Sequence, residues 1–270
     1  MKLTQQQLLF FDVFGFLKLP GLFKDEIGTI TEEFEKVLQA YEGIMGSHDG
    51  SKRTMVPCVD SSYYLSSLLD DSRIVDVAGS LLGDDFNYWG SDGNYYTGDT
   101  GWHPDGGEPK YLHIKLAFYL DELDGSNGAL RVIPGSHRET DRYALDILRT
   151  LRNSQQHFGI HGSEVPAQVL DVTPGDLLIF NHRTFHSAWG GGNKRRMFTM
   201  NMCQRYKEED IGFLRKMIVP HVGVHVNRYF GDAMLESAGP ERMKHLEQMI
   251  GLWDWDALTK GMPEFNYLKV

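Results

Sequence analysis

The stretch GDLLIFNHRTFHSAWGGGNKRRMFTMN, residues 175–201, decides which fold the chain can adopt. It begins with a short apolar run, continues through two histidines to a glycine-rich turn, and ends in a second apolar run that starts with a basic residue. Short apolar runs separated by turn residues are typical of antiparallel strands. The stretch therefore predicts two strands, with histidines and a tight turn between them.

The same pattern begins at about residue 84. Further short runs, rich in aromatic and β-branched residues, are separated by glycine, proline, asparagine and aspartate. They are DFNYWGSDGNYYTGDTGWHPDGG, KYLHIKLAFYLDEL, GALRVIPGSH and QVLDVTPGDLLIFN. Turns that recur between such runs predict an antiparallel sandwich or barrel. We expect a mainly β fold of the jelly-roll type, with its core at about residues 84–206.

Helical patterns flank this core. Thr4 is a candidate N-cap with Gln7 as its capping-box partner, so an opening helix is expected to end at Gly15. A short strand is expected over residues 16–20, and the polar segment 42–57 is expected to be a long loop. Apolar residues at helical spacing predict further helices over residues 24–41, 61–69, 72–82, 141–153, 207–218 and 240–258. We expect residues 1–270 to form one domain with helical flanks.

The composition limits the classes of partner. The chain carries 27 basic and 37 acidic residues, a formal net charge of -10, and no basic stripe, which argues against nucleic acid as the main partner. No run approaches 18 apolar residues, so no membrane-spanning helix is expected. Cys58 and Cys203 lack CxxC spacing and are expected to be buried thiols, which favours the cytoplasm. A small-molecule substrate is expected, and the oligomeric state stays open.

The second informative stretch is GWHPDGG, residues 101–107. His103 and Asp105 are two residues apart, so on an extended strand end both side chains point to the same face and can reach one metal ion. A third ligand must come from a distant strand, and His182 and His186 are the candidates. Two histidines and one carboxylate suit non-haem iron(II), and a zinc site remains an alternative.

Four blocks of the sequence resemble the phytanoyl-CoA dioxygenase family of iron(II)- and 2-oxoglutarate-dependent oxygenases. They are LTQQQLLFFDVFGFLKLPGLF, WHPD, LDGSNGALRVIPGSHR and GDLLIFNHRTFHSAWGGGNKRR, in the family's order over roughly residues 3–204. The resemblance implies a double-stranded β-helix that uses iron(II), 2-oxoglutarate and O2. It also implies that His103, Asp105 and His186 hold the iron. His182, the other candidate, is expected to be a supporting or capping histidine.

The resemblance further implies a basic residue that binds the far carboxylate of 2-oxoglutarate from the strand after the distal histidine. Arg196 is expected to do so because it begins the strand RMFTMN, and Arg195 is the second choice. Thr100, Lys115 and Ser187 are expected to contribute to the same site. Many relatives carry a hydroxyl residue two positions after the distal histidine, where this chain has Ala188, so Ser187 is the nearest substitute.

The substrate pocket is expected to involve Asn94, Tyr96, Trp102 and Arg131. Lys115 and Arg131 are charged residues within β-like runs. They face solvent, or they point inward and need an anionic partner. The inward alternative predicts a small anionic or zwitterionic substrate. Members of the resembled family that halogenate lack the carboxylate ligand, so the presence of Asp105 implies hydroxylation or a related oxidation. Two rivals remain: a cupin-like hydrolase or isomerase that does not use 2-oxoglutarate, and a barrel that binds a ligand without catalysis.

Overall fold

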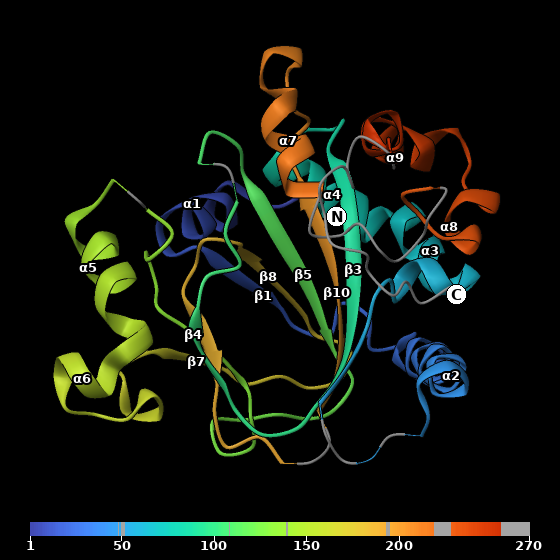
Figure 1. Ribbon diagram of the computed structural model, residues 1–270. Helices are drawn as coiled ribbons and strands as arrows, with labels where there is room; N and C mark the ends of the chain where they lie inside the picture. Colours follow the sequence, from blue (N-terminus) through green and yellow to red (C-terminus); the bar gives the residue numbers. More distant parts are fainter. Residues whose placement is uncertain are drawn as a thin grey trace.

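The computed structural model describes residues 1–47, 49, 52–107, 109–138, 140–192, 195–218 and 228–254. Its strands form two antiparallel sheets (Figure 1). The larger sheet contains, in spatial order, β1 (Phe16–Leu19), β8 (Leu177–Asn181), β5 (His113–Tyr119), β10 (Arg195–Cys203), β3 (Asn87–Tyr96) and β2 (Arg53–Met55). The smaller sheet contains β4 (Thr100–His103), β9 (His186–Ala188), β6 (Leu130–Val132) and β7 (Gln168–Leu170). The predicted mainly β jelly-roll fold is confirmed.

Two strands of the larger sheet come from outside the range expected for the core. The predicted strand at residues 16–20 is present as β1, and it pairs with β8 in a register that sets Phe16 opposite Phe180. The segment 42–57, predicted to be a loop, is only partly one. The preceding helix continues to Met45, and β2 pairs with β3 at the other edge of the sheet.

Helices cover the outer faces of both sheets. In Figure 1, α2, α3, α8 and α9 lie outside the larger sheet, whereas α5 and α6 lie beyond the smaller one. The α-helices are α1 (Gln5–Phe14), α2 (Ile27–Met45), α3 (Tyr63–Ser67), α4 (Ser72–Leu82), α5 (Arg142–Thr150), α6 (Ser154–Phe158), α7 (Ile211–Ile218), α8 (Asp232–Glu236) and α9 (Pro240–Leu252). The 3-10 turns are η1 (Val59–Ser61), η2 (Leu68–Asp70), η3 (Leu151–Asn153), η4 (Gly162–Glu164) and η5 (Glu208–Asp210).

The helix boundaries follow local chemistry closely. The capping box predicted for α1 is present: the Thr4 hydroxyl accepts from the Gln7 amide, and the Gln7 side chain accepts from the Thr4 amide. Gly15 ends this helix at φ 82°, in the left-handed region that favours glycine. The helix predicted over residues 240–258 ends at Leu252, and its last predicted residues lie outside the described part of the chain.

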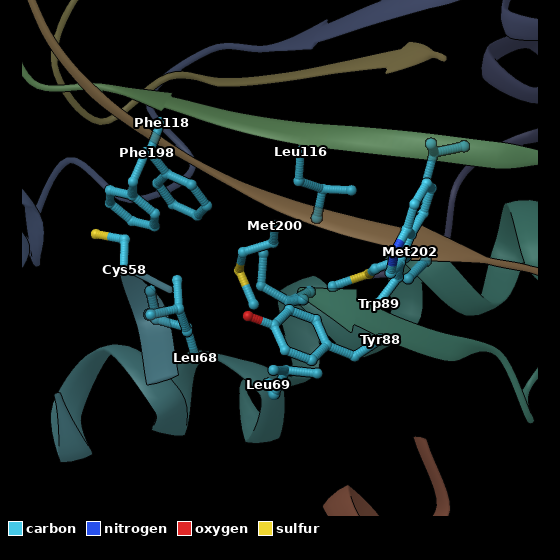
Figure 2. Packing of buried hydrophobic residues seen from close by; sticks show 14 of the residues in the cluster. Cys58, Leu68, Leu69, Tyr88, Trp89, Leu116, Phe118, Phe198, Met200 and Met202 are labelled. Atoms are coloured by element: carbon cyan, nitrogen blue, oxygen red, sulfur yellow. The ribbon is translucent and has the colours of Figure 1, made fainter. Parts of the chain in front are cut away.

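Strand alternation divides the larger sheet into an outer apolar face and an inner mixed face. On the outer face the rings of Phe118 and Phe198 stack at 4.7 Å with an interplanar angle of 7°, and Met200 lies in the same cluster (Figure 2). On the inner face, Phe180 and Met197 pack between the sheets. The outer face therefore carries most of the apolar packing, and the inner face has room for polar side chains.

Both cysteines are buried free thiols, as predicted. Within the described ranges, none of the helices combines the length and the apolar character that crossing a membrane requires.

Asp60, in η1, is a carboxylate buried to 2% exposure. Burial raises its pKa from 3.8 to about 6, although the Tyr88 hydroxyl donates a hydrogen bond to it at 2.8 Å. Four other titratable groups interact electrostatically with Asp60: the hydroxyls of Tyr41, Tyr88 and Tyr229 and the thiol of Cys58. Burial raises the pKa of each of them. Asp60 is therefore the member of this group that changes charge near neutral pH.

We expect Asp60→Asn to stabilise the protein, and to do so more strongly at pH 8 than at pH 5. Because the pKa of Asp60 is higher in the folded than in the unfolded chain, wild-type stability falls as pH rises from about 4 to about 6 and stays low above that. The gain from the substitution should be larger by about 1 kcal/mol at pH 8. Urea unfolding at both pH values measures it, with Asp25→Asn, at an exposed position, as the control. An equal effect at the two pH values would contradict the expectation.

Candidate metal centre and adjoining cavities

The three residues that the sequence singled out as ligands lie together where β4 meets β9. His103, at the end of β4, is directly opposite His186, at the start of β9. Asp105 follows two residues beyond the strand, and its carboxylate oxygens lie 4.0 Å from Nε2 of His103 and 3.8 Å from Nε2 of His186. One ligand atom from each residue lies within 4.8 Å of the others. Side chains of these types, converging in this way, can share one metal ion.

Backbone carbonyls orient both imidazoles. Nδ1 of His103 lies 2.8 Å from the Gly101 carbonyl oxygen, and Nδ1 of His186 lies 2.9 Å from that of Thr184. A carbonyl can only accept, so each Nδ1 carries the proton and each Nε2 offers a lone pair towards Asp105. Burial also lowers the pKa of His186 to about 4, which keeps the ring neutral. Neutral imidazoles with a free Nε2 are the form that binds a metal.

His182 lies beside the triad without joining it. Its backbone carbonyl accepts hydrogen bonds from the amides of Asp105, at 2.8 Å, and Gly106, at 3.2 Å. Its ring is 3% exposed and faces a separate cavity. The geometry therefore agrees with the choice of His186 over His182 as the third member, and it gives His182 the task of holding the Asp105 segment in place.

Lys115, on β5, points inward and meets the triad. Its Nζ lies 2.9 Å from Oδ2 of Asp105, and its side chain is 14% exposed. Burial alone would lower the pKa of Lys115, but the charges of Asp105 and Asp92 outweigh it and raise the pKa above its usual range. Burial likewise acts to raise the pKa of Asp105, yet Lys115 and the neighbouring histidines hold it well below its usual range. Both groups are charged, and the solvent-facing alternative for Lys115 is wrong.

A cavity of about 70 Å³ touches all three triad residues. Most of the residues predicted to bind 2-oxoglutarate line it, and so does the predicted pocket residue Tyr96. The polar side chains on its walls, besides the triad, are Asp92, Tyr96, Thr100, Lys115, Tyr119, Ser187, Arg195 and Thr199. We name this space the inner cavity.

Arg195 is the buried cation of the inner cavity. It is 2% exposed, its Nη1 donates to the Gly128 carbonyl at 2.7 Å, and its guanidinium lies 4.8 Å from the centre of the Tyr96 ring. Among the described residues no carboxylate lies within 4.0 Å of this guanidinium. A buried charge without a counter-charge is costly, so this position is suited to an anionic ligand.

Arg196 lies on the opposite face of β10, so the prediction that it reaches the pocket is wrong. Its Nη2 lies 2.6 Å from Oδ1 of Asp121, and its Nη1 lies 2.6 Å from Oε1 of Glu35 on α2. Successive side chains of a strand point to opposite faces. The sequence pattern of β10 could have indicated this. Arg195, Thr199 and Asn201 are polar and lie at alternate positions of the strand. Arg196 instead shares its face with the apolar residues Phe198 and Met200.

Three residues predicted to line the pocket line neither cavity at the triad. Trp102 packs beneath the inserted helices and donates its Nε1 hydrogen to the Gly162 carbonyl at 2.8 Å. Arg131 donates to the carbonyls of Ser163 and Gly125, at 2.7 and 2.9 Å. Asn94 is bonded to the side chains of Asp92 and Thr54. Those predictions are wrong because the three side chains make their hydrogen bonds to structural neighbours, although Nε of Arg131 has no partner among the described residues.

A second cavity, of about 210 Å³, adjoins the inner one, and we name it the outer cavity. The two share Asp92, Asp105 and Lys115 as wall residues. The outer cavity is otherwise lined by Val56, Pro57, Asp60, Trp89, Gly90, Ser91, His182, Asn201, Tyr229 and Phe230. Sequence reasoning missed most of these. The alternation of polar and apolar residues along β10 could have indicated that Asn201 faces inward. No local sequence pattern indicates that Tyr229 and Phe230 line this cavity.

Comparisons with known proteins agree with this geometry. Residues 11–197 match the family described as phytanoyl-CoA dioxygenase (PhyH). The ectoine dioxygenase of Sphingopyxis alaskensis is 26% identical over 222 residues, which cover 70% of this chain and 71% of that protein. The ectoine dioxygenase of Stutzerimonas stutzeri is 27% identical over 212 residues, with coverages of 65% and 68%.

Solved structures share the fold. HygX from Streptomyces hygroscopicus, with nickel and 2-oxoglutarate bound, superposes with a TM-score of 0.61 at 18% identity, covering 76% of this chain and 89% of that one. EctD from S. alaskensis gives a TM-score of 0.57 at 22% identity, with coverages of 75% and 77%. The family match spans well over half of the sequence. The chain therefore belongs to the phytanoyl-CoA dioxygenase family and is an iron(II)-dependent dioxygenase that uses 2-oxoglutarate and O2.

Proposed function

We propose that this dioxygenase hydroxylates a compact organic molecule bound in the outer cavity. In this proposal His103, Asp105 and His186 hold the iron, and the inner cavity binds 2-oxoglutarate. The observation that carries it is that the triad lines the inner cavity, which contains a buried guanidinium without an ionic partner among the described residues, and that Asp105 of the triad also lines the outer cavity.

The donor set of the triad fits iron(II). Two imidazole Nε2 atoms and one carboxylate form the ligand set typical of non-haem iron oxygenases, which leaves coordination positions open. The chemistry supplied by bound iron(II) and O2 is the oxidation of 2-oxoglutarate to succinate and CO2, with transfer of the second oxygen atom into a substrate C–H bond. The chain itself orients the ligands through the carbonyls of Gly101 and Thr184 and keeps Asp105 ionised through Lys115.

The unpaired guanidinium of Arg195 in the inner cavity suits a carboxylate of the cosubstrate. Arg195 can bind one carboxylate of 2-oxoglutarate through its planar fork of donors. Lys115 lies on the same walls but is paired with Asp105, so it leaves Arg195 as the unpaired cation, and the hydroxyls of Thr100 and Ser187 are further wall groups. A hydrolase or isomerase that does not use 2-oxoglutarate would have no need of an unpaired guanidinium here, which weighs against that rival.

The outer cavity is the proposed substrate site. Structures of relatives contain small organic molecules, 5-hydroxyectoine in EctD and hygromycin B in HygX. The expectation of an anionic or zwitterionic substrate rested on Lys115 and Arg131, but Lys115 is paired with Asp105, and Arg131 lies elsewhere. We therefore propose a small organic substrate, and these two residues give no reason to expect negative charge on it.

His103→Ala should abolish the iron and 2-oxoglutarate complex. Wild-type protein incubated anaerobically with iron(II) and 2-oxoglutarate should develop a weak visible charge-transfer band, because the triad leaves positions for the cosubstrate. The variant should show no band, whereas His157→Ala, at an exposed position on α6, should retain it. A band of wild-type intensity in His103→Ala, or none in the wild type, would refute the proposed function.

Arg195→Gln should weaken the binding of 2-oxoglutarate, whereas Arg196→Gln should lower the stability of the fold. Loss of charge-assisted hydrogen bonds should raise the KM for 2-oxoglutarate by about 10- to 100-fold in Arg195→Gln. Arg196→Gln should leave this KM within about twofold but lower the free energy of unfolding by about 1–3 kcal/mol, because it loses bonds to Asp121 and Glu35. Steady-state kinetics with varied 2-oxoglutarate and urea unfolding measure the two effects. The reverse pattern would assign the cosubstrate to Arg196.

A further inference from the structure

The outer cavity contains a buried carboxylate without a cation. Asp60 accepts from the Tyr88 hydroxyl at 2.8 Å, and the amide of Gly231 lies 3.5 Å from its second oxygen. Among the described residues no lysine, arginine or histidine nitrogen lies within 4.0 Å of it. A buried carboxylate accepts up to about four hydrogen bonds. Asp60 therefore retains both negative charge and acceptor capacity on the cavity wall.

The other charges of this cavity do not neutralise Asp60. Lys115 is the lysine on its walls, and its ammonium is held 2.9 Å from Asp105. Asp92, on the boundary with the inner cavity, accepts from neutral donors, the Thr199 hydroxyl and the Asn94 amide, both at 2.6 Å. The outer cavity thus presents net negative charge to whatever it binds.

Uncharged groups on the walls also lack partners. His182 is 3% exposed, and neither of its ring nitrogens has a hydrogen-bond partner within the described part of the chain. Oδ1 of Asn201 is a buried acceptor that also has no hydrogen-bond partner among the described residues. Buried polar atoms are nearly always satisfied, and an unsatisfied one costs about 1–3 kcal/mol. A polar ligand in this cavity would supply the missing partners.

The rest of the wall is apolar and aromatic. Trp89, Tyr229 and Phe230 line the cavity together with Val56 and Pro57. Aromatic faces attract cations as well as carbon skeletons. The volume of about 210 Å³ exceeds the roughly 150 Å³ of an engineered cavity in another protein that binds benzene. The outer cavity is therefore large enough for a molecule built on one six-membered ring.

We propose that the substrate carries a positively charged nitrogen group, an ammonium or amidinium, which Asp60 binds while the aromatic wall packs against the carbon skeleton. This inference rests on the proposed function, since it takes the outer cavity to be the substrate site. His182 and Asn201 then complete the hydrogen bonds of the polar part, and the C–H bond to be oxidised faces the triad at the shared boundary of the two cavities.

Three probes that differ only in their head group test the proposal. They are cyclohexylammonium, cyclohexanol and cyclohexanecarboxylate, titrated calorimetrically at pH 8 into anaerobic protein loaded with iron(II) and 2-oxoglutarate. The ammonium should bind at least about 10-fold more tightly than the alcohol, and the carboxylate most weakly. Asp60→Asn should reduce the affinity for the ammonium by about 10-fold or more and change that for the alcohol by less than about twofold. Asp25→Asn should behave as wild type.

The visible band reports the proposed function separately from this inference. If the band forms but the three probes bind equally, the ammonium fails to bind up to about 10 mM, or Asp60→Asn retains the preference, the inference is overturned. The same titrations without iron and 2-oxoglutarate determine the preference of the cavity even if no band forms. Urea unfolding of Asp60→Asn at pH 8, where the variant is expected to be more stable than the wild type, distinguishes weaker binding from unfolding.

Discussion

The antiparallel pairing of β4 with β9 is the constraint on which the candidate site depends. It sets His103 opposite His186 across two strands that lie far apart in the chain. The His182 carbonyl then holds the amide of Asp105 at 2.8 Å, so that the carboxylate reaches both imidazoles. A register shift of one residue would turn either histidine to the other face of the sheet. The ligand set therefore exists only while this register is kept.

Opposite charges lie on the two sides of the boundary between the inner and the outer cavity. Arg195, in the inner cavity, is a buried cation, and Asp60, in the outer cavity, is a buried anion, and neither has an ionic partner among the described residues. Burying an unpaired charge destabilises a fold. The charged pair of Lys115 and Asp105 lies between them and separates the two environments. This arrangement matches an anionic cosubstrate on one side and a cationic substrate group on the other.

The two faces of the larger sheet differ in composition, and the apolar packing of the outer face offsets the cost of burying charges on the inner one. Its outer face carries most of the apolar packing, where Phe118 and Phe198 stack on each other (Figure 2). Because side chains alternate along each strand, the same strands can present Lys115 and Thr199 to the interior. The outer face of the larger sheet thus carries most of the apolar packing, while the inner face combines apolar packing with room for ligands.

Local sequence patterns determined the class of fold, the capped helix α1 and the pair His103 and Asp105, because each depends on residues close together in the chain. The family resemblance added His186. Tertiary structure decided the rest. Arg195 and Arg196 are neighbours, and only the pairing of β10 shows which one faces inward. Asp60 and Tyr229 meet in one cavity because the packing of helices against β3 brings distant segments together, and no local periodicity encodes that contact.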